Sequence, residues 1–243
     1  VMFCPIEANF YYSFKDSVNA AILDNLYGWH ALTENIIYFY YMEHFPNYYM
    51  VYYDVIDSIK ENFKLSSELG GLMMYNLAQY NNPNASAFSR LKAYLNAKLM
   101  WNVNEDVDAL VDNFFANYFG SASGTMRTIF NEYRAMSKAA CEKDSTIGQI
   151  STGYHTFKAE DFDRATLVRL IKLIDTAYED VKPLETTDNA EYLRLTKAIK
   201  LESMFLRSTY IEYFGSYALV DFKVTQSSMK SAWKADATEL NIV

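Results

Sequence analysis

The segment NIIYFYYM, residues 35–42, decides the fold class of this chain, because a short run of β-branched and aromatic residues is typical of a strand. Two further runs of this kind, residues 1–10 and 70–77, lie before and after it. Helical patterns occupy the segments between the three runs. Strands that alternate with helices predict a parallel sheet whose strands are joined by crossover helices.

The two connecting segments carry apolar residues on one helical face. In residues 16–32 these residues recur at spacings of four, four and three, and in residues 49–63 at a spacing of four. They are Val18, Ile22, Leu26 and Trp29 in the first segment and Val51, Val55, Ile59 and Phe63 in the second. Trp29, like Trp101 further on, lies on an apolar stripe, so we expect both indole rings in the core.

Strand signals vanish after Trp101, and helical patterns take over. A turn cluster lies at residues 80–84, and either its last residue, Asn84, or Ser86 after it would cap the next helix. Apolar stripes then predict helices over residues 105–119, 126–140, 161–182 and 188–214, with Asp188 and Glu191 approximating a capping box. These helices predict a bundle. Residues 144–158 form the expected loop.

The expected sheet poses a physical difficulty. A parallel sheet of three strands has two unpaired edges and two faces that need cover, and it rarely stands alone. We therefore expect a fragment of a larger protein, with further strands upstream. The alternatives are that the helical part or a second copy of the chain covers the edges. The sequence does not give the oligomeric state.

Composition restricts the partners of the chain. The 22 basic and 30 acidic residues give a net charge of −8, which argues against nucleic acid. No apolar run reaches the roughly 18–20 residues that span a bilayer. Cys4 and Cys141 fit small buried or half-buried apolar positions better than a disulfide. The histidines and cysteines lack metal-ligand spacing, so we expect neither a metal site nor another cofactor.

Tyrosine is unusually frequent, with 21 residues in the chain. A tyrosine ring offers an apolar face and a hydroxyl, which suits a site that stacks on sugar rings and bonds their hydroxyls. The alternative is a core and interfaces rich in amphipathic rings. Taken alone, the tyrosine content favours this second interpretation.

Several blocks resemble a bacterial family known as domain of unknown function 4838. They are residues 3–7, 25–29, 36–47 and 70–76, and above all Leu91-Lys92-Ala93-Tyr94-Leu95-Asn96-Ala97-Lys98-Leu99-Met100-Trp101 with residues 106–110 and 118–120. The resemblance covers roughly residues 1–140. It implies a glycoside-hydrolase-like protein related to the (β/α)8 (TIM-type) barrel, exported or on the cell surface of a bacterium.

The resemblance also implies a division of the chain and a place for its site. Residues 1–101 would hold three strands of a partial barrel, and residues 102–243 a helical domain. Barrel sites lie at the carboxyl ends of the strands. We expect Glu7 and Glu43 there as catalytic carboxylates, and as substrate-binding residues Tyr11, Tyr12, Tyr41, His44, Tyr75 and Asn76.

Two departures from the family pattern bear on the activity. Tyr40 and Met74 stand where carboxylates are expected, whereas a glycosidase normally needs two carboxylates. The leading hypothesis is the C-terminal portion of a glycoside-hydrolase-like protein that acts on glycans, inactive by itself without the upstream barrel domain. The alternative is a noncatalytic carbohydrate-binding or structural module.

Overall fold

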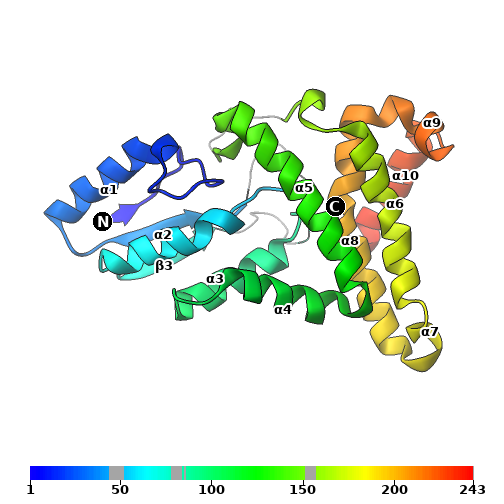
Figure 1. The fold of residues 1–243 in the computed structure, drawn as a ribbon, viewed down its shortest axis with the longest axis horizontal. Coiled ribbons are helices and arrows are strands. Elements are labelled where there is room, and N and C mark those ends of the chain that lie inside the picture. Colours follow the sequence, from blue (N-terminus) through cyan, green and yellow to red (C-terminus); the bar gives the residue numbers. More distant parts are fainter. Residues whose placement is uncertain (44–51, 78–83, 85, 151–156, 243) are drawn as a thin grey trace.

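Three strands of the described residues form one parallel sheet at one end of the molecule (Figure 1). The computed structural model describes residues 1–43, 52–77, 84, 86–150 and 157–242. Strands β1 (Met2–Phe3), β2 (Ile37–Tyr41) and β3 (Met73–Leu77) lie in the order β1-β2-β3. Both neighbouring pairs are parallel. The predicted parallel sheet with helical crossovers is thereby confirmed.

The first strand is much shorter than the expected residues 1–10. Pro5 has no N–H to donate to a neighbouring strand, and a turn follows in which Ala8 N donates to Pro5 O at 3.0 Å. The chain therefore leaves the sheet after Phe3. The residues that follow pack against α5 (Ser123–Lys143) instead.

The connecting helices are α1 (Ala20–Leu32), preceded by a 3₁₀ turn at Ser17–Asn19, and α2 (Ile56–Glu68). Helix α2 begins seven residues later than expected, because the Asp54 carboxylate accepts from Ile56 N at 3.0 Å and caps the helix there. Of the stripe predicted on residues 16–32, only Leu26 is fully buried. The described elements therefore cover α1 completely only at Leu26.

Both tryptophan expectations were wrong. Trp29 is 46% exposed on α1, and Trp101 is 92% exposed as the last residue of α3 (Ser89–Trp101). Helical spacing places a side chain on a face, but the neighbouring elements decide whether that face is covered. Cys4 is exposed rather than half-buried, whereas Cys141 is buried as expected, and both thiols are free.

The rest of the chain is helical, as predicted. It comprises α3, α4 (Val107–Phe119), α5, α6 (Arg164–Val181), α7 (Leu184–Thr187), α8 (Asn189–Phe214), α9 (Ala218–Phe222) and α10 (Gln226–Glu239). Helices α7, α9 and α10 were not predicted. Helices α3 and α4 lie between the sheet end and the α6–α8–α10 end of the molecule (Figure 1). The chain is a mostly helical α/β protein.

Local capping explains where two of these helices begin. Asp106 accepts from Asp108 N at 3.0 Å at the start of α4, and Asp188 accepts from Glu191 N at 3.1 Å at the start of α8. The Glu191 carboxylate pairs with Arg194 instead of closing a capping box. The expected caps of α3 were wrong, because Ser86 donates to Glu43 and the residue before α3 is Phe88.

One hydrophobic core runs from the sheet into the helices. Phe88 lies in an aromatic cluster, with ring centroids 4.7 Å from Phe130, 5.8 Å from Phe205 and 5.9 Å from Phe115. Its backbone has φ 53, a left-handed conformation that non-glycine residues rarely adopt. No helix in the part of the chain that the structure describes is long and apolar enough to cross a membrane.

Candidate functional site

The sheet presents one face that is partly open. Side chains alternate along a strand, and Ile37, Phe39 and Tyr41 lie in register with Met73, Tyr75 and Leu77. We call these six residues the open face. On the opposite face Tyr38 and Tyr40 are buried, and Tyr40 packs edge-on against Phe63 of α2 with ring centroids 5.4 Å apart. The helical layer thus covers one face, while Met73 and Tyr75 on the other stay exposed.

Three rings on the open face form a continuous aromatic surface. Phe39 lies 4.9 Å from Tyr41 and 4.9 Å from Tyr75 between ring centroids. Of these rings, that of Tyr41 is buried, whereas that of Tyr75 is 48% exposed. Since Tyr75 sits on β3 with its ring toward solvent, it offers a flat apolar surface with a hydroxyl at its edge.

Glu7 lies close to this aromatic surface. It is exposed in the turn after β1. Burial raises the pKa of Tyr41, and the nearby Cys4 and Glu7 add to the rise. Glu7 therefore supplies an accessible carboxylate beside Tyr41, at the carboxyl end of the first strand.

Tyr11, Tyr12 and Asn76 lie elsewhere. The Tyr11 side chain is buried, and its hydroxyl is hydrogen-bonded to Ser137 of α5. Tyr12 is half-buried, and the charges of Lys138 and Glu142 on α5 act on its hydroxyl. Asn76 belongs to the helix-facing side of β3, where its amide contacts Met100 Sδ at 3.0 Å. The structure therefore brings together Tyr41 and Tyr75 through Phe39, and the charge of Glu7 acts on Tyr41, whereas Tyr11, Tyr12 and Asn76 lie apart from this surface. His44 lies outside the described residues.

Glu43 follows β2 and is part of a buried ionic network. Its Oε2 accepts hydrogen bonds from Lys92 Nζ of α3 and from Ser86 Oγ. Lys92 is fully buried, donates to Tyr53 O at 3.3 Å and lies 5.4 Å from the centroid of the Tyr52 ring. Burial raises the pKa of Glu43, while Lys92 and Ser86 oppose the rise.

A second buried carboxylate, Glu202 of α8, completes what we call the carboxylate network, which consists of Glu43, Ser86, Lys92 and Glu202. Glu202 Oε2 accepts from Phe88 N at 2.7 Å. Burial raises the pKa of Glu202 to about 7. The Phe88 N–H and the cations of Arg90 and Lys92 oppose this rise in pKa, whereas the charge of Glu43 adds to the rise. The network joins the end of β2 to α3 and α8.

Sequence reasoning missed Phe39, Lys92 and Glu202. Phe39 had a usable signal, since it shares the strand parity of Tyr41 and lies between Tyr41 and Tyr75. Lys92 and Glu202 had none, because charged residues within helical patterns normally face solvent.

The family of the chain follows from a match to a sequence model. The model described as "Domain of unknown function (DUF4838)" matches residues 1–131, more than half of the chain. The chain belongs to this family. The DUF4838 match spans the sheet, α1 to α4 and the first turns of α5, and therefore includes the open face, Glu43 and Lys92. No curated protein matches the chain, and no solved structure matches it.

Proposed function

We propose that this chain is the C-terminal portion of a bacterial glycoside-hydrolase-like protein, and that it binds glycans through the open face without hydrolysing them alone. The observation that carries the proposal is the aromatic surface of Phe39, Tyr41 and Tyr75. A sugar ring has an apolar face of C–H groups and a rim of hydroxyls. Tyr75 matches the face with its ring and the rim with its hydroxyl, and Glu7 accepts from a neighbouring hydroxyl.

Hydrolysis places a further demand on the site, since two carboxylates must flank the scissile bond. Glu7 is exposed, but Glu43 is buried and held by Lys92 and Ser86. This arrangement favours binding over hydrolysis by this chain, and it supports the alternative of a noncatalytic carbohydrate-binding module.

The proposed context is a barrel with its remaining units in an upstream domain of the same polypeptide. The outer edges of β1 and β3 pair with no strand of the described residues. Large apolar side chains lie exposed near both edges, among them Met2 and Met73. Strands added at these edges would pair the backbone there and place the carboxyl ends of β2 and β3, with Tyr41, at the mouth of the barrel. An extracellular or cell-surface location belongs to the same proposal.

Glycan-array binding by the purified chain tests the proposed function. We expect selective binding that Tyr75→Ala weakens about tenfold or more, because an aromatic surface and a hydroxyl contact are both lost. The matched control is Tyr27→Ala, since Tyr27 is 44% exposed on α1, away from the open face. Circular dichroism checks folding of both variants.

Equal binding by the Tyr75→Ala variant, or no binding by folded wild type, would contradict the proposal. Hydrolysis of a bound glycan by wild type, abolished by Glu7→Gln, would instead establish a catalytic chain. Glu7→Gln is suited to this test because Glu7 is exposed and its substitution leaves the core intact.

A further inference from the structure

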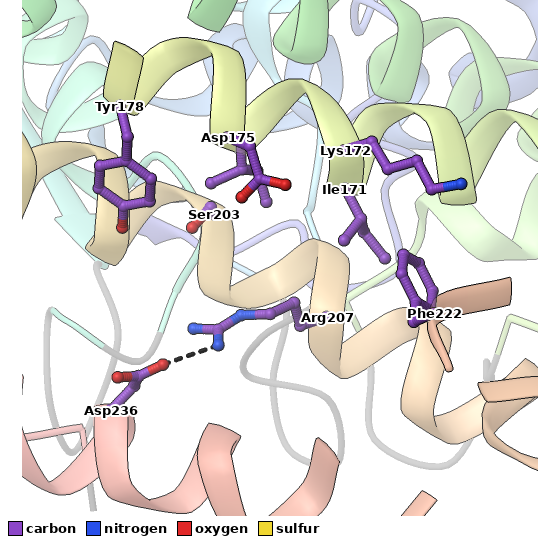
Figure 2. A pocket seen from close by; sticks show the side chains of 9 residues that line it. Ile171, Lys172, Asp175, Tyr178, Ser203, Arg207, Phe222 and Asp236 are labelled. Atoms are coloured by element: carbon purple, nitrogen blue, oxygen red, sulfur yellow. Dashed lines mark ion pairs between the residues drawn. The ribbon is translucent and has the colours of Figure 1, made fainter. Parts of the chain in front are cut away.

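A separate pocket lies among the helices, away from the sheet. It has a volume of about 360 Å³ and opens between α6, α8 and α10, with Phe222 of α9 at one end (Figure 2). Asp175 and Tyr178 point from α6 toward α8, and Arg207 reaches from α8 to Asp236 on α10. We call this the helical pocket. Its volume lies at the lower end of the range of about 300–1,000 Å³ for small-molecule sites.

The cations and anions around the pocket balance each other. Asp236 pairs with Arg207 Nη1 at 2.7 Å and with Lys200 Nζ at 3.4 Å. Lys200 also pairs with Glu239 at 2.8 Å, so the two cations and two anions offset each other. Lys172 and Asp175 are both exposed at the rim, and neither forms an ion pair with any residue that the structure describes. With one cation and one anion left, the pocket favours a ligand without net charge over a phosphate or another anion.

The polar groups of the pocket include both hydrogen-bond donors and acceptors. Asp175 is an acceptor, whereas Ser203 is buried and donates its proton to Lys200 O at 3.0 Å. Burial raises the pKa of Tyr178, the cations of Lys200 and Arg207 oppose this rise, and Asp236 and Asp175 add to it, so the hydroxyl stays protonated and can donate. Adjacent sugar hydroxyls each donate and accept, and this mixed pattern suits them.

Aromatic rings complete the pocket. Phe222 forms one end and Tyr178 the other, with Ile171 between them (Figure 2), and Ile174 also lines the pocket. The Phe222 ring is faced by Lys172 Nζ, 5.9 Å from its centroid, so the ring that suits the C–H face of a sugar is that of Tyr178. Tyr178 also lines a second hollow of about 610 Å³, together with Tyr192. Because the two hollows share Tyr178, a glycan chain matches them better than a free amino acid does.

From this geometry we infer that the helical pocket binds the terminal sugar of an uncharged glycan, as a second site distinct from the open face. Asp175 accepts from its hydroxyls, Tyr178 donates to them, and the ring of Tyr178 borders its apolar face. The site belongs to α6, α8, α9 and α10, all of which lie beyond the residues that the family match covers. The inference thus goes beyond the proposed function.

Ligand-observed NMR with methyl glycosides tests the inference on the full chain. The probes are the neutral methyl glycosides of glucose, galactose, mannose, xylose and N-acetylglucosamine at millimolar concentration, with glucuronic acid and glycine betaine as charged and zwitterionic comparisons. We expect a neutral glycoside to bind, and Asp175→Asn to weaken it about tenfold or more, since a hydrogen bond to a charged group is lost. The matched control Asp24→Asn, an exposed carboxylate on α1, leaves binding unchanged.

The Tyr75→Ala variant separates this inference from the proposed function. Binding that survives Tyr75→Ala and is lost in Asp175→Asn supports the helical pocket whatever happens at the open face. Binding that is lost in Tyr75→Ala and unchanged in Asp175→Asn overturns the helical pocket and leaves the proposed function standing. Absence of binding by any neutral glycoside to folded wild type, or binding of glucuronic acid or glycine betaine in their place, also overturns it.

Discussion

Replacing Lys92 with methionine tests the buried carboxylate network directly. Methionine keeps the length of the apolar stem but removes the ammonium group that bonds to Glu43 and to Tyr53 O. Glu43 then keeps only Ser86 as a hydrogen-bond donor among the described residues. Because Lys92 and Glu43 are 0% and 2% exposed, water does not replace the lost partner.

The expected cost follows from this burial. Removing one partner of a buried ion pair costs about 3–5 kcal/mol, because the other charge stays buried and unpaired. The double variant Lys92→Met/Glu43→Gln carries no charge at either position, so its cost should fall to the roughly 1–3 kcal/mol of an imperfectly bonded buried amide. The exposed pair Lys15 and Glu68, 3.4 Å apart, supplies the control, and Lys15→Met should cost about 0–1 kcal/mol.

Urea denaturation at pH 7, followed by circular dichroism, measures these differences in the free energy of unfolding. The expected order of destabilisation is Lys92→Met, then the double variant, then Lys15→Met. The reasoning is refuted if Lys92→Met costs no more than Lys15→Met, or if adding Glu43→Gln makes the Lys92→Met variant less stable still.

Two further predictions concern α8 and the start of α3. Burial raises the pKa of Glu202 from 4.5 to about 7, so between these values the folded state holds a proton that the unfolded state has lost, and stability falls as pH rises. From pH 4 to 8, urea denaturation should show wild type losing roughly 3 kcal/mol more than Glu202→Gln, and parallel pH profiles would contradict this. At Phe88, the same assay should show a cost of about 3–5 kcal/mol for Phe88→Ala, from lost packing. Phe88→Gly should cost no more than Phe88→Ala, since glycine adopts φ 53 without strain, and a clearly less stable glycine variant would contradict this.

Local sequence signals determined the order and type of most elements. Apolar period and β-rich runs identified the three strands and, apart from the short α7, the helices up to Phe214, because these signals depend on neighbours a few residues apart. Asp188 was also identified as a cap, since its carboxylate reaches the N–H of Glu191 within the same turn. The short α7 and α9 were missed because they are too short to show a helical period, and α10 was missed because its residues are mostly polar.

Local sequence signals predicted only part of the candidate site. The sequence named Tyr41 and Tyr75 as substrate-binding residues, but the pairing of β2 with β3 was needed to place them on one face. The sequence could not show that Tyr11 faces α5, because residues 1–10 do not continue as a strand beyond Phe3. Glu7 and Glu43 looked alike in the sequence, as acidic residues near strand ends. The structure exposes Glu7 and buries Glu43 under Lys92.

By itself, then, the sequence determined most of the elements and that the strands run parallel, because hydrophobic periodicity and capping act over a few residues. Tertiary structure alone decided which faces are covered and which charges are paired. Lys92 meets Glu43 across 49 residues, and Phe88 N meets Glu202 across 114. Such contacts depend on how distant helices pack, and helical spacing is the same whether a face meets solvent, as at Trp101, or the core, as at Leu99.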